Sequence, residues 1–312
     1  MKQAVLLLGG SGFIGRHLAN QLSRQGYGVT IPSRQREHAR EKLIILPNVQ
    51  LIQADIHDQQ VLESLLQAHL IIINLVGILH GDSNAFQRAH VQLTEKIVHT
   101  CEAIGKRRYL HMSALGADPL GPSNYLRSKG QAEYLVKQSS LDWTIMRPSA
   151  VFGNDDQFLN VLAKLLHYSP LLPLVAATSK LQPIWVEDVA RAFIISLSSP
   201  QYSHQSLNLV GPNVYTLLEL ALFVRRLTGK RRMIIALPDK LARIFAIILQ
   251  QLPQPWLSLD NLDSMRIDNI DLTGFPALLG FQPSALETVL PNYLGKTNLA
   301  ASYPRFRSKA HR

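Results

Sequence analysis

The sequence predicts an α/β fold with a doubly wound parallel sheet and a small C-terminal α/β region. Through the first half of the 312 residues, short apolar runs alternate with amphipathic segments, which is typical of parallel strands joined by helices. The first apolar run ends in the glycine-rich stretch LLLGGSGFIG. The pattern changes near Arg147–Pro148, after which prolines are frequent and the expected strands are short. The chain is therefore expected to form two regions.

The expected strands of the first half are short apolar runs, each bounded by polar or glycine residues. In order, they are Ala4–Leu8, Gly28–Ile31, Val49–Gln53, Leu70–Leu75, Arg108–Met112 and Trp143–Met146. Amphipathic segments lie between them, and the clearest are Gln87–Ala103 and Ser128–Lys137. Because the crossovers between parallel strands are right-handed, helices should cover both faces of the sheet.

Two helices are expected in the second half, at Thr216–Thr228 and Pro238–Gln251. Thr216 and Glu219 have the spacing of a capping box, and Gly229 is placed to end the first of these helices. The segment Gln182–Ser199 is expected to return to the sheet. The sheet domain is therefore assigned to residues 1–148 and 180–200, and the smaller substrate or partner region to residues 149–179 and 201–312.

Composition narrows the class of protein. No run of about 18 apolar residues is present, so no membrane-spanning helix is expected. The sequence opens on the first strand without a charged and apolar leader, and we therefore expect a cytoplasmic location. Cys101 is the single cysteine, which fits a reducing compartment, and it is expected to be a small buried hydrophobic residue.

The formal net charge of +10 arises partly from three clusters of basic residues. They are Arg34, Arg36, Arg40 and Lys42; Arg225, Arg226, Lys230, Arg231 and Arg232; and the stretch RFRSKAHR at residues 305–312. Basic surfaces attract phosphates, anionic lipid surfaces or acidic partners. No nucleic-acid-binding module and no basic stripe interleaved with aromatic residues is present, so no nucleic-acid partner is expected.

The stretch Leu241–Leu249 is apolar around most of its circumference, and Lys240 and Arg243 lie near its start. A buried helix is the favoured interpretation. The alternative is a helix that docks onto a membrane surface or a partner protein, which would place the protein peripherally on the inner face of the cell membrane.

The glycines of the opening stretch are spaced as in a dinucleotide-binding loop. Gly9 would allow the tight turn, Gly12 would let the backbone approach a pyrophosphate, and Gly15 would let the helix pack close to the strand. The backbone from Ser11 through Phe13 and Ile14 to Gly15 would then present its N–H groups and the helix dipole to the diphosphate. This pattern predicts that the sheet domain is a dinucleotide-binding domain of the Rossmann type; the alternative is a purely structural turn between strand and helix.

The second expected strand ends in Ser33 and Arg34, where sites specific for NAD usually have an acidic residue. A guanidinium binds a 2′-phosphate with two parallel hydrogen bonds, and a serine hydroxyl supports it, so the residues favour NADP(H) over NAD(H). The alternative is a solvated basic loop. Asp55, after the third strand, is placed to reach the adenine amino group or to cap the helix that starts near His57.

The catalytic candidates are Tyr125, Lys129 and Ser113. Residues four apart share a helix face, so the Lys129 ammonium is expected to stabilise the Tyr125 phenolate and lower its pKa. The phenol could then exchange a proton with a carbonyl or alcohol while hydride moves to or from the nicotinamide. Ser113, at the end of the fifth strand, could orient the same oxygen. Val76 and Gly77, at the end of the fourth strand, would border the nicotinamide ribose or form a simple turn.

Other polar residues point to structure. The eleven histidines form no HxxxH or HxH cluster, so no metal site is expected. Glu187 and Asp188 are expected to cap and charge the first turn of a helix rather than to act as a paired acid and base.

Several of these motifs together resemble the extended short-chain dehydrogenase/reductase superfamily. They are GGSGFIG at residues 9–15, Ser113, Tyr125 with Lys129, RPS at 147–149 with FG at 152–153, and PIWVEDVA at 183–190. A narrower similarity is to the branch that contains the NADPH-binding accessory subunit of respiratory complex I. It is carried by IPSR at 31–34, NLVG at 74–77, YLRSK at 125–129, FGNDDQFLN at 152–160, and Gly211-Pro212 with Tyr215, and it fades after about Asp268.

The resemblance implies a bacterial relative of that subunit, with NADP(H) held by a defined set of residues. They are Gly9, Gly12, Gly15, Arg34, Asp55, Tyr125 and Lys129. The accessory subunit keeps the Tyr-x-x-x-Lys pair in a structural role, so the pair alone does not establish turnover.

Two functions therefore follow, from different classes. The first is an NAD(P)-dependent oxidoreductase or epimerase acting on a carbonyl, alcohol or quinone, with Tyr125 as acid/base, Lys129 as its neighbour and Ser113 as the orienting group. The second is a non-catalytic NADPH-binding accessory subunit or assembly factor of a respiratory NADH:quinone oxidoreductase. A redox-sensing regulator is a third possibility.

Overall fold

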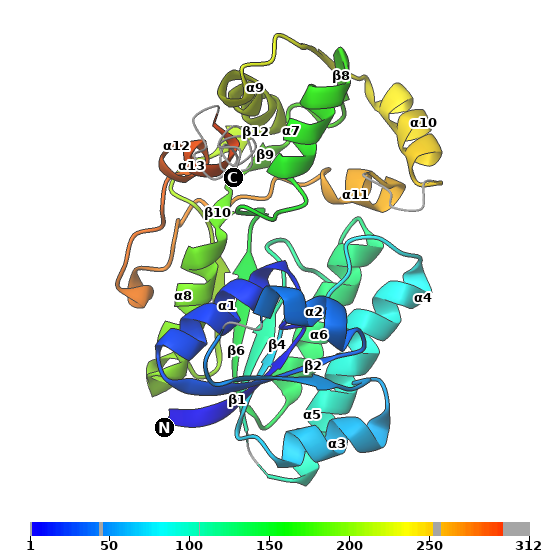
Figure 1. Ribbon diagram of the computed structural model, residues 1–312. Helices are drawn as coiled ribbons and strands as arrows, with labels where there is room; N and C mark the ends of the chain where they lie inside the picture. The colour runs from blue at the N-terminus through cyan, green and yellow to red at the C-terminus, as the bar shows by residue number, and fades with distance from the viewer. Residues whose placement is uncertain (1, 44–45, 106, 252–256, 296–312) are drawn as a thin grey trace.

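The computed structural model describes residues 2–43, 46–105, 107–251 and 257–295. Its centre is a seven-stranded parallel sheet in the order β11-β6-β5-β4-β1-β2-β3. The strands are β1 (Lys2–Leu8), β2 (Tyr27–Ser33), β3 (Val49–Gln53), β4 (Ile71–Asn74), β5 (Arg108–Met112), β6 (Asp142–Pro148) and β11 (Gln205–Leu209). This is a Rossmann-type sheet, and a smaller lobe lies beyond the carboxyl ends of its strands (Figure 1).

Helices cover both faces of the sheet, as the alternating sequence pattern predicts. On one face, α1 (Phe13–Arg24) and α8 (Val186–Leu197) pack against the sheet through residues such as Leu18 and Phe193. On the other, α3 (Gln59–Gln67), α5 (Leu93–Ala103) and α6 (Asn124–Gln138) contribute Leu62, Ile97 and Val136 to a second core. A shorter helix, α2 (Arg36–Leu43), lies beside β3 (Figure 1).

All six strands predicted in the first half are present, and two of them have the predicted bounds. The seventh, β11, comes from the range that the sequence analysis assigned to the smaller region. It pairs with β6 alone, and its sequence QSLNL carries only two apolar residues, so it lacks the buried run that marks the central strands. The segment Gln182–Ser199 returns to the sheet as expected, because α8 packs on α1.

The predicted helix Gln87–Ala103 is a π-helix over its first six residues and an α-helix over the rest. A short helix, α4 (Ser83–Phe86), leads into a π-helical segment, η1 (Gln87–Gln92), and only then into α5. π-Helical turns are rare and are frequent at functional sites. Here the π-helix carries His90, which is buried beside α6.

The smaller lobe is built from short strand pairs and short helices (Figure 1). Its strands are β7 (Val151–Phe152), β8 (Leu171–Leu174), β9 (Lys180–Leu181), β10 (Ile184–Trp185), β12 (Tyr215–Thr216) and β13 (Met233–Ala236). Its helices are α7 (Leu159–Tyr168), α9 (Leu217–Thr228), α10 (Asp239–Leu249), α11 (Leu259–Ser264), α12 (Leu286–Val289) and α13 (Pro291–Leu294). Phe152, Leu162 and Leu220 belong to its main core.

Local signals in this lobe act as the sequence predicts. Thr216 and Glu219 form the capping box of α9, and Gly229 ends that helix in the left-handed conformation. The preferred interpretation of Leu241–Leu249 is only half right, because Ala242 and Ala246 are buried while the opposite side of α10 is exposed. Among the described residues, no helix has the length and apolar content needed to cross a bilayer. The basic stretch at 305–312 lies outside the described residues.

Candidate nucleotide-binding and catalytic site

The loop between β1 and α1 depends on its glycines for steric reasons. Gly9 has a φ of 75°, and a Cβ atom there would lie 2.9 Å from the carbonyl carbon of Leu75. At Gly15 a Cβ atom would lie 2.5 Å from the Gly9 oxygen and 2.6 Å from the Gly10 Cα. Gly12 is exposed and extended, so its backbone can be approached from outside. The three positions have the geometry expected of a phosphate-binding turn.

The N-terminus of α1 differs from those of α3 and α6. No side chain caps it, and no acidic residue lies in its first turn. In contrast, Asp58 caps α3 and Ser123 caps α6, each accepting a hydrogen bond from a first-turn N–H. The first-turn amides of a helix lack partners within it, so those of Phe13, Ile14 and Gly15 are free to bind an anion.

Gln53, the last residue of the neighbouring strand β3, holds the loop after β2 in place. The side chain of Gln53 donates to the Arg34 carbonyl at 2.6 Å and accepts from the Arg36 amide at 3.2 Å. The Ser33 hydroxyl accepts from the Gln35 amide at 3.2 Å, and the Arg34 side chain is exposed. The loop backbone is therefore fixed while the Arg34 guanidinium can reach a ligand. Gln53 was not identified from the sequence, because its role depends on β3 lying beside β2.

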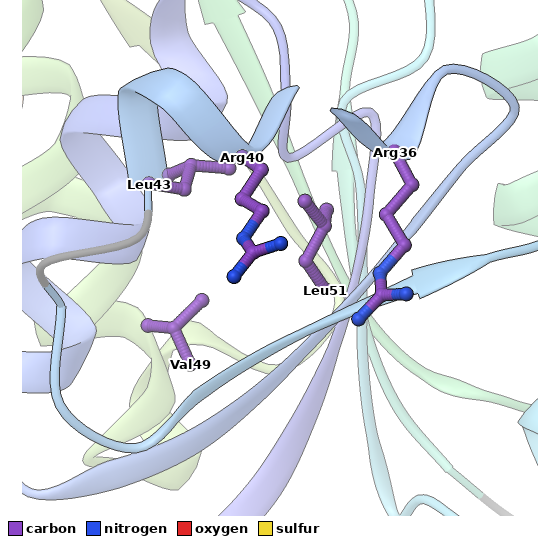
Figure 2. A pocket seen from close by; sticks show the side chains of 5 residues that line it. All are labelled: Arg36, Arg40, Leu43, Val49 and Leu51. Atoms are coloured by element: carbon purple, nitrogen blue, oxygen red, sulfur yellow. The ribbon is translucent and has the colours of Figure 1, made fainter. Parts of the chain in front are cut away.

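A cavity of about 160 Å³ lies between α2 and β3 (Figure 2). It is lined by Arg36, Arg40, Leu43, Val49 and Leu51. Val49 begins β3 and Leu43 ends α2, so the cavity follows the edge of the sheet rather than the carboxyl ends of its strands. Its volume is below the roughly 300 Å³ or more of small-molecule sites. We therefore place the nucleotide elsewhere, at the strand ends.

Asp55 does not cap the following helix, so that alternative is wrong. Helix α3 begins at Gln59, and its cap is Asp58, whose carboxylate accepts from the Val61 amide. Asp55 instead accepts from the His57 amide at 3.0 Å in the turn after β3. This leaves it at the strand end, where the interpretation as an adenine contact still applies.

Lys129 is buried at the carboxyl ends of β4 and β5. Its ammonium donates to the carbonyl oxygen of Met112 at 3.0 Å and to that of Val76 at 3.5 Å. Gly77 borders it closely, since a Cβ there would lie 3.2 Å from the Lys129 Nζ. Burial lowers the pKa of Lys129 to about 8, against the attraction of Glu133, so the ammonium still carries its charge at neutral pH.

The π-helix places His90 against the same lysine and tyrosine. The Ile78 amide donates to His90 Nε2 at 3.1 Å, so the hydrogen resides on Nδ1, which lies 2.8 Å from the Ser128 hydroxyl oxygen. The His90 ring also contacts the Tyr125 ring edge-on, with centroids 5.7 Å apart. His90 thus ties the loop after β4 to α6. The sequence offered no signal for it beyond a single histidine in a predicted helix.

The ionisation of Tyr125 differs from the expectation. Burial raises the pKa of Tyr125 to about 12, whereas a lowered value was predicted. The reason is geometric: the Lys129 ammonium is bound by two strand-end carbonyls, and desolvation therefore dominates at the phenol. At neutral pH the phenol keeps its proton and can donate a hydrogen bond.

Two buried polar atoms at the end of β5 have no partner among the described residues. They are the Ser113 hydroxyl oxygen and the Nε2 of His111, and both residues lie on the same side of the strand. The Tyr109 hydroxyl lies 3.2 Å from the His111 Nδ1. Buried polar groups without partners are uncommon in native proteins. With the glycine turn and the uncapped helix, they fit a polar ligand such as a nicotinamide nucleotide at these strand ends.

The two buried histidines predict a loss of stability in acid. Burial, with the charge of Lys129, lowers the pKa of His90 to about 2 and that of His111 to about 3, against about 6.5 in the unfolded chain. Below pH 6.5 the unfolded chain therefore binds protons that the folded protein cannot, so stability falls as pH falls. We expect each histidine to cost about 2 kcal/mol of unfolding free energy at pH 5 relative to pH 7.5.

Urea unfolding at the two pH values measures this effect. His111→Met should lose about 2 kcal/mol less than the wild type between them. His99→Gln, at an exposed histidine of α5, should lose as much as the wild type. If the unfolding free energies of the wild type and His111→Met change equally with pH, the lowered pKa of His111 is contradicted.

Helix α11 of the smaller lobe holds the start of the helix that carries Tyr125. The Asp260 carboxylate accepts from the Asn124 amide at 2.7 Å and from the Tyr125 amide at 3.1 Å. Ser264 donates to the Ser123 hydroxyl at 2.8 Å, and Asn261 donates to the Leu79 carbonyl at 3.3 Å. Helix α11 therefore bridges α6 and the loop after β4, next to the catalytic candidates. Sequence reasoning missed it because these contacts join residues more than 130 positions apart.

Removing the Asp260 carboxylate should loosen this end of α6. Asp260→Ala is expected to cost about 1–2 kcal/mol of unfolding free energy, the usual effect of losing a cap, and to speed nucleotide dissociation. Asp263→Ala is the matched control, because Asp263 pairs with Arg243 and Arg266 rather than with α6. Denaturation and stopped-flow fluorescence of bound NADPH measure both effects. Equal dissociation rates in the two variants would show that Asp260 has no special role.

Other candidates from the sequence are structural. Glu187 and Asp188 do lie in the first turn of α8, but neither caps it: Glu187 bonds His17 and Gln21 of α1, and Asp188 accepts from the Ser284 amide. Cys101 is buried, and burial raises the pKa of its thiol to about 12. Within the described residues, no three His, Cys, Asp or Glu side chains group as metal ligands would.

Comparisons with known proteins agree with this architecture. The model of the NAD(P)H-binding family matches residues 9–166, just over half of the chain. NADH dehydrogenase (ubiquinone) 1 alpha subcomplex subunit 9 of Arabidopsis thaliana is 30% identical over 280 residues, which is 85% of this chain and 70% of the relative. Ceramide reductase of Caulobacter vibrioides is 27% identical over 262 residues, 84% of this chain and 80% of the relative.

Solved structures show the same fold. UDP-glucuronic acid 4-epimerase from Bacillus cereus superposes with a TM-score of 0.72 at 18% identity, covering 93% of this chain and 98% of the epimerase. At that identity the likeness establishes the fold alone. The protein belongs to the NAD(P)H-binding family and is a homologue of subunit 9 of the mitochondrial NADH dehydrogenase alpha subcomplex.

Proposed function

We propose that this protein binds NADP(H) as a resident ligand and serves as an accessory subunit or assembly factor of a respiratory NADH:quinone oxidoreductase. The observation that carries the proposal is the way in which the nicotinamide end is held. The Lys129 ammonium donates to two strand-end carbonyls, and the Asp260 carboxylate of α11 accepts from the first two amides of α6 beside it. Such an arrangement is suited to holding a nucleotide.

The proposed residues divide the nucleotide between them. The amides of Ser11, Phe13, Ile14 and Gly15 would bind the pyrophosphate, and Asp55 would contact the adenine. Ser33 and Arg34 would bind the 2′-phosphate, which favours NADP(H) over NAD(H). Val76, Gly77, Tyr125 and Lys129 would border the nicotinamide ribose. When bound, the nucleotide would supply a hydride at this end of the site.

A resident nucleotide stabilises the folded protein by mass action. The proposal predicts that the purified protein carries about one NADPH per chain. At a free concentration of 100 times the Kd, the added nucleotide would contribute about 2.7 kcal/mol, which corresponds to a rise in Tm of roughly 4 °C for a chain of 312 residues. The relatives named as mitochondrial NADH dehydrogenase subunits favour a partner in a respiratory complex.

A second candidate function is the reduction of a carbonyl compound or quinone, or a related epimerase reaction. The unpartnered Ser113 hydroxyl favours it, because it could donate to a substrate oxygen, and so does the similarity to a ceramide reductase. In that reaction the Tyr125 phenol would give its proton to the oxygen, and the Lys129 ammonium would stabilise the resulting phenolate.

The variant Tyr125→Phe separates the two functions. The protein is loaded with NADPH, and absorbance at 340 nm is followed with a panel of small carbonyl compounds and quinones. If the protein is an accessory subunit, neither the wild type nor Tyr125→Phe oxidises NADPH with any compound of the panel. Oxidation by the wild type that falls at least about 100-fold in Tyr125→Phe would establish the reductase instead.

A further inference from the structure

The outer face of α10 is an apolar surface to which no other described residue supplies a covering partner. It consists of Leu241, Ile244, Ile247 and Ile248, whose side chains are between 46% and 62% exposed. At 100° per residue these four residues fall within one third of the helix circumference. Ala242 and Ala246, on the other side, pack with Leu262 of α11. The helix is thus apolar on two sides, and only one of them is used within the described chain.

The segment around this face is strongly basic. Residues 225–249 contain seven Lys or Arg and one acidic residue, Asp239. Lys240 lies within the angular range of the apolar residues, and Arg231 is exposed in the turn that leads into β13. β13 continues directly into α10, at the end of the molecule far from the sheet (Figure 1).

Two further apolar side chains belong to the same part of the lobe. Met233 and Ile235 of β13 are exposed, and Met233 is paired with the exposed Leu171 of β8. Exposed aliphatic residues beside an excess of cations are the composition of helices that lie in a membrane interface. Each Lys or Arg near an anionic lipid surface strengthens the electrostatic attraction of the protein to that surface. The aliphatic side chains of such a helix insert at the boundary between headgroups and acyl chains.

We propose that the outer face of α10 docks onto an anionic lipid bilayer, with its cations against the headgroups. The location at a membrane rests on the function proposed above. The new part is that the outer face of α10 is the docking surface and that the lipid is anionic. Charge complementarity favours the bilayer over a second copy of this chain, because two copies would bring equally basic segments together.

Flotation of the full-length, NADPH-loaded protein with lipid vesicles tests the proposal. We expect binding to vesicles that contain phosphatidylglycerol and little binding to pure phosphatidylcholine. Ile244→Ser/Ile248→Ser should weaken the binding by about tenfold or more, and Lys230→Gln/Arg231→Gln/Lys240→Gln should weaken it most at low ionic strength. Leu120→Ser/Leu272→Ser is the matched control, because these exposed leucines lie outside the lobe surface described above.

Bound NADPH, measured by absorbance in each variant, separates this test from that of the nucleotide site. Loss of flotation with NADPH retained supports the docking face. Equal flotation of wild type and Ile244→Ser/Ile248→Ser would overturn it. Binding only to native membranes, abolished by protease treatment of those membranes, would also overturn it and would indicate a protein partner.

Discussion

Replacing Gly15 with alanine is expected to abolish nucleotide binding, with a loss of affinity of about 100-fold or more. The new methyl group would lie 2.5 Å from the Gly9 oxygen and 2.6 Å from the Gly10 Cα, and the contacting atoms are backbone that cannot move aside. The whole turn must therefore open, which moves the backbone amides of the β1–α1 loop away from the pyrophosphate. The overpacking also lowers the free energy of unfolding by about 1–3 kcal/mol. Fluorescence titration with NADPH and urea unfolding measure the two effects.

Two other glycines make this prediction specific. Gly28→Ala in β2 should behave like the wild type, since the nearest atoms to its Cβ are 3.8 Å away. Gly12→Ala needs only a small local shift, because its φ is −73° and its Cβ would lie 3.2 Å from the Gly9 oxygen, but its methyl group would block the approach of the phosphates. Full nucleotide affinity in both Gly12→Ala and Gly15→Ala would rule out this loop as the site.

Reversing the charge of Arg34 is expected to remove the proposed preference for NADP(H). Arg34→Glu replaces a donor pair by a carboxylate that repels the 2′-phosphate, so the Kd for NADPH should rise by about 100-fold while that for NADH stays the same or falls. Gln53 holds the loop backbone through the Arg34 carbonyl, so the variant should keep the loop geometry.

Lys164→Glu, a charge reversal at an exposed residue of α7, is the control for the change in net charge. It should leave the ratio of the NADPH and NADH affinities unchanged. If the ratio of the NADPH and NADH affinities of Arg34→Glu equals that of the wild type, a group other than Arg34 binds the 2′-phosphate. Arg36, which begins α2, would be the next candidate.

The sheet could be predicted from the sequence because its determinants are local. Runs such as Val49–Gln53 and Arg108–Met112 carry the apolar content of a strand within five residues, and Gly9, Gly12 and Gly15 identify the turn that follows β1. β11 could not be predicted in the same way. It is stabilised by pairing with β6, and nothing within QSLNL requires a strand.

The role of the candidate residues in a site stays a prediction, and the structure shows only where they lie. Tyr125, Lys129 and Ser113 do gather at the ends of β4, β5 and the start of α6, as their order suggested. The direction of the Tyr125 pKa depends on where the lysine ammonium points, which spacing along a helix does not determine. His90 and Asp260 act through contacts between distant segments, and no motif of adjacent residues marks them.

Isothermal titration calorimetry of the protein, after removal of any co-purified nucleotide, tests the central claim most directly. We expect NADP+ and NADPH to bind at one site per chain, and NAD+ to bind at least about tenfold more weakly, in keeping with the loss of one charge-assisted contact. An absence of binding heat with all three nucleotides at several temperatures would contradict the claim that the β1–α1 loop and Arg34 hold NADP(H).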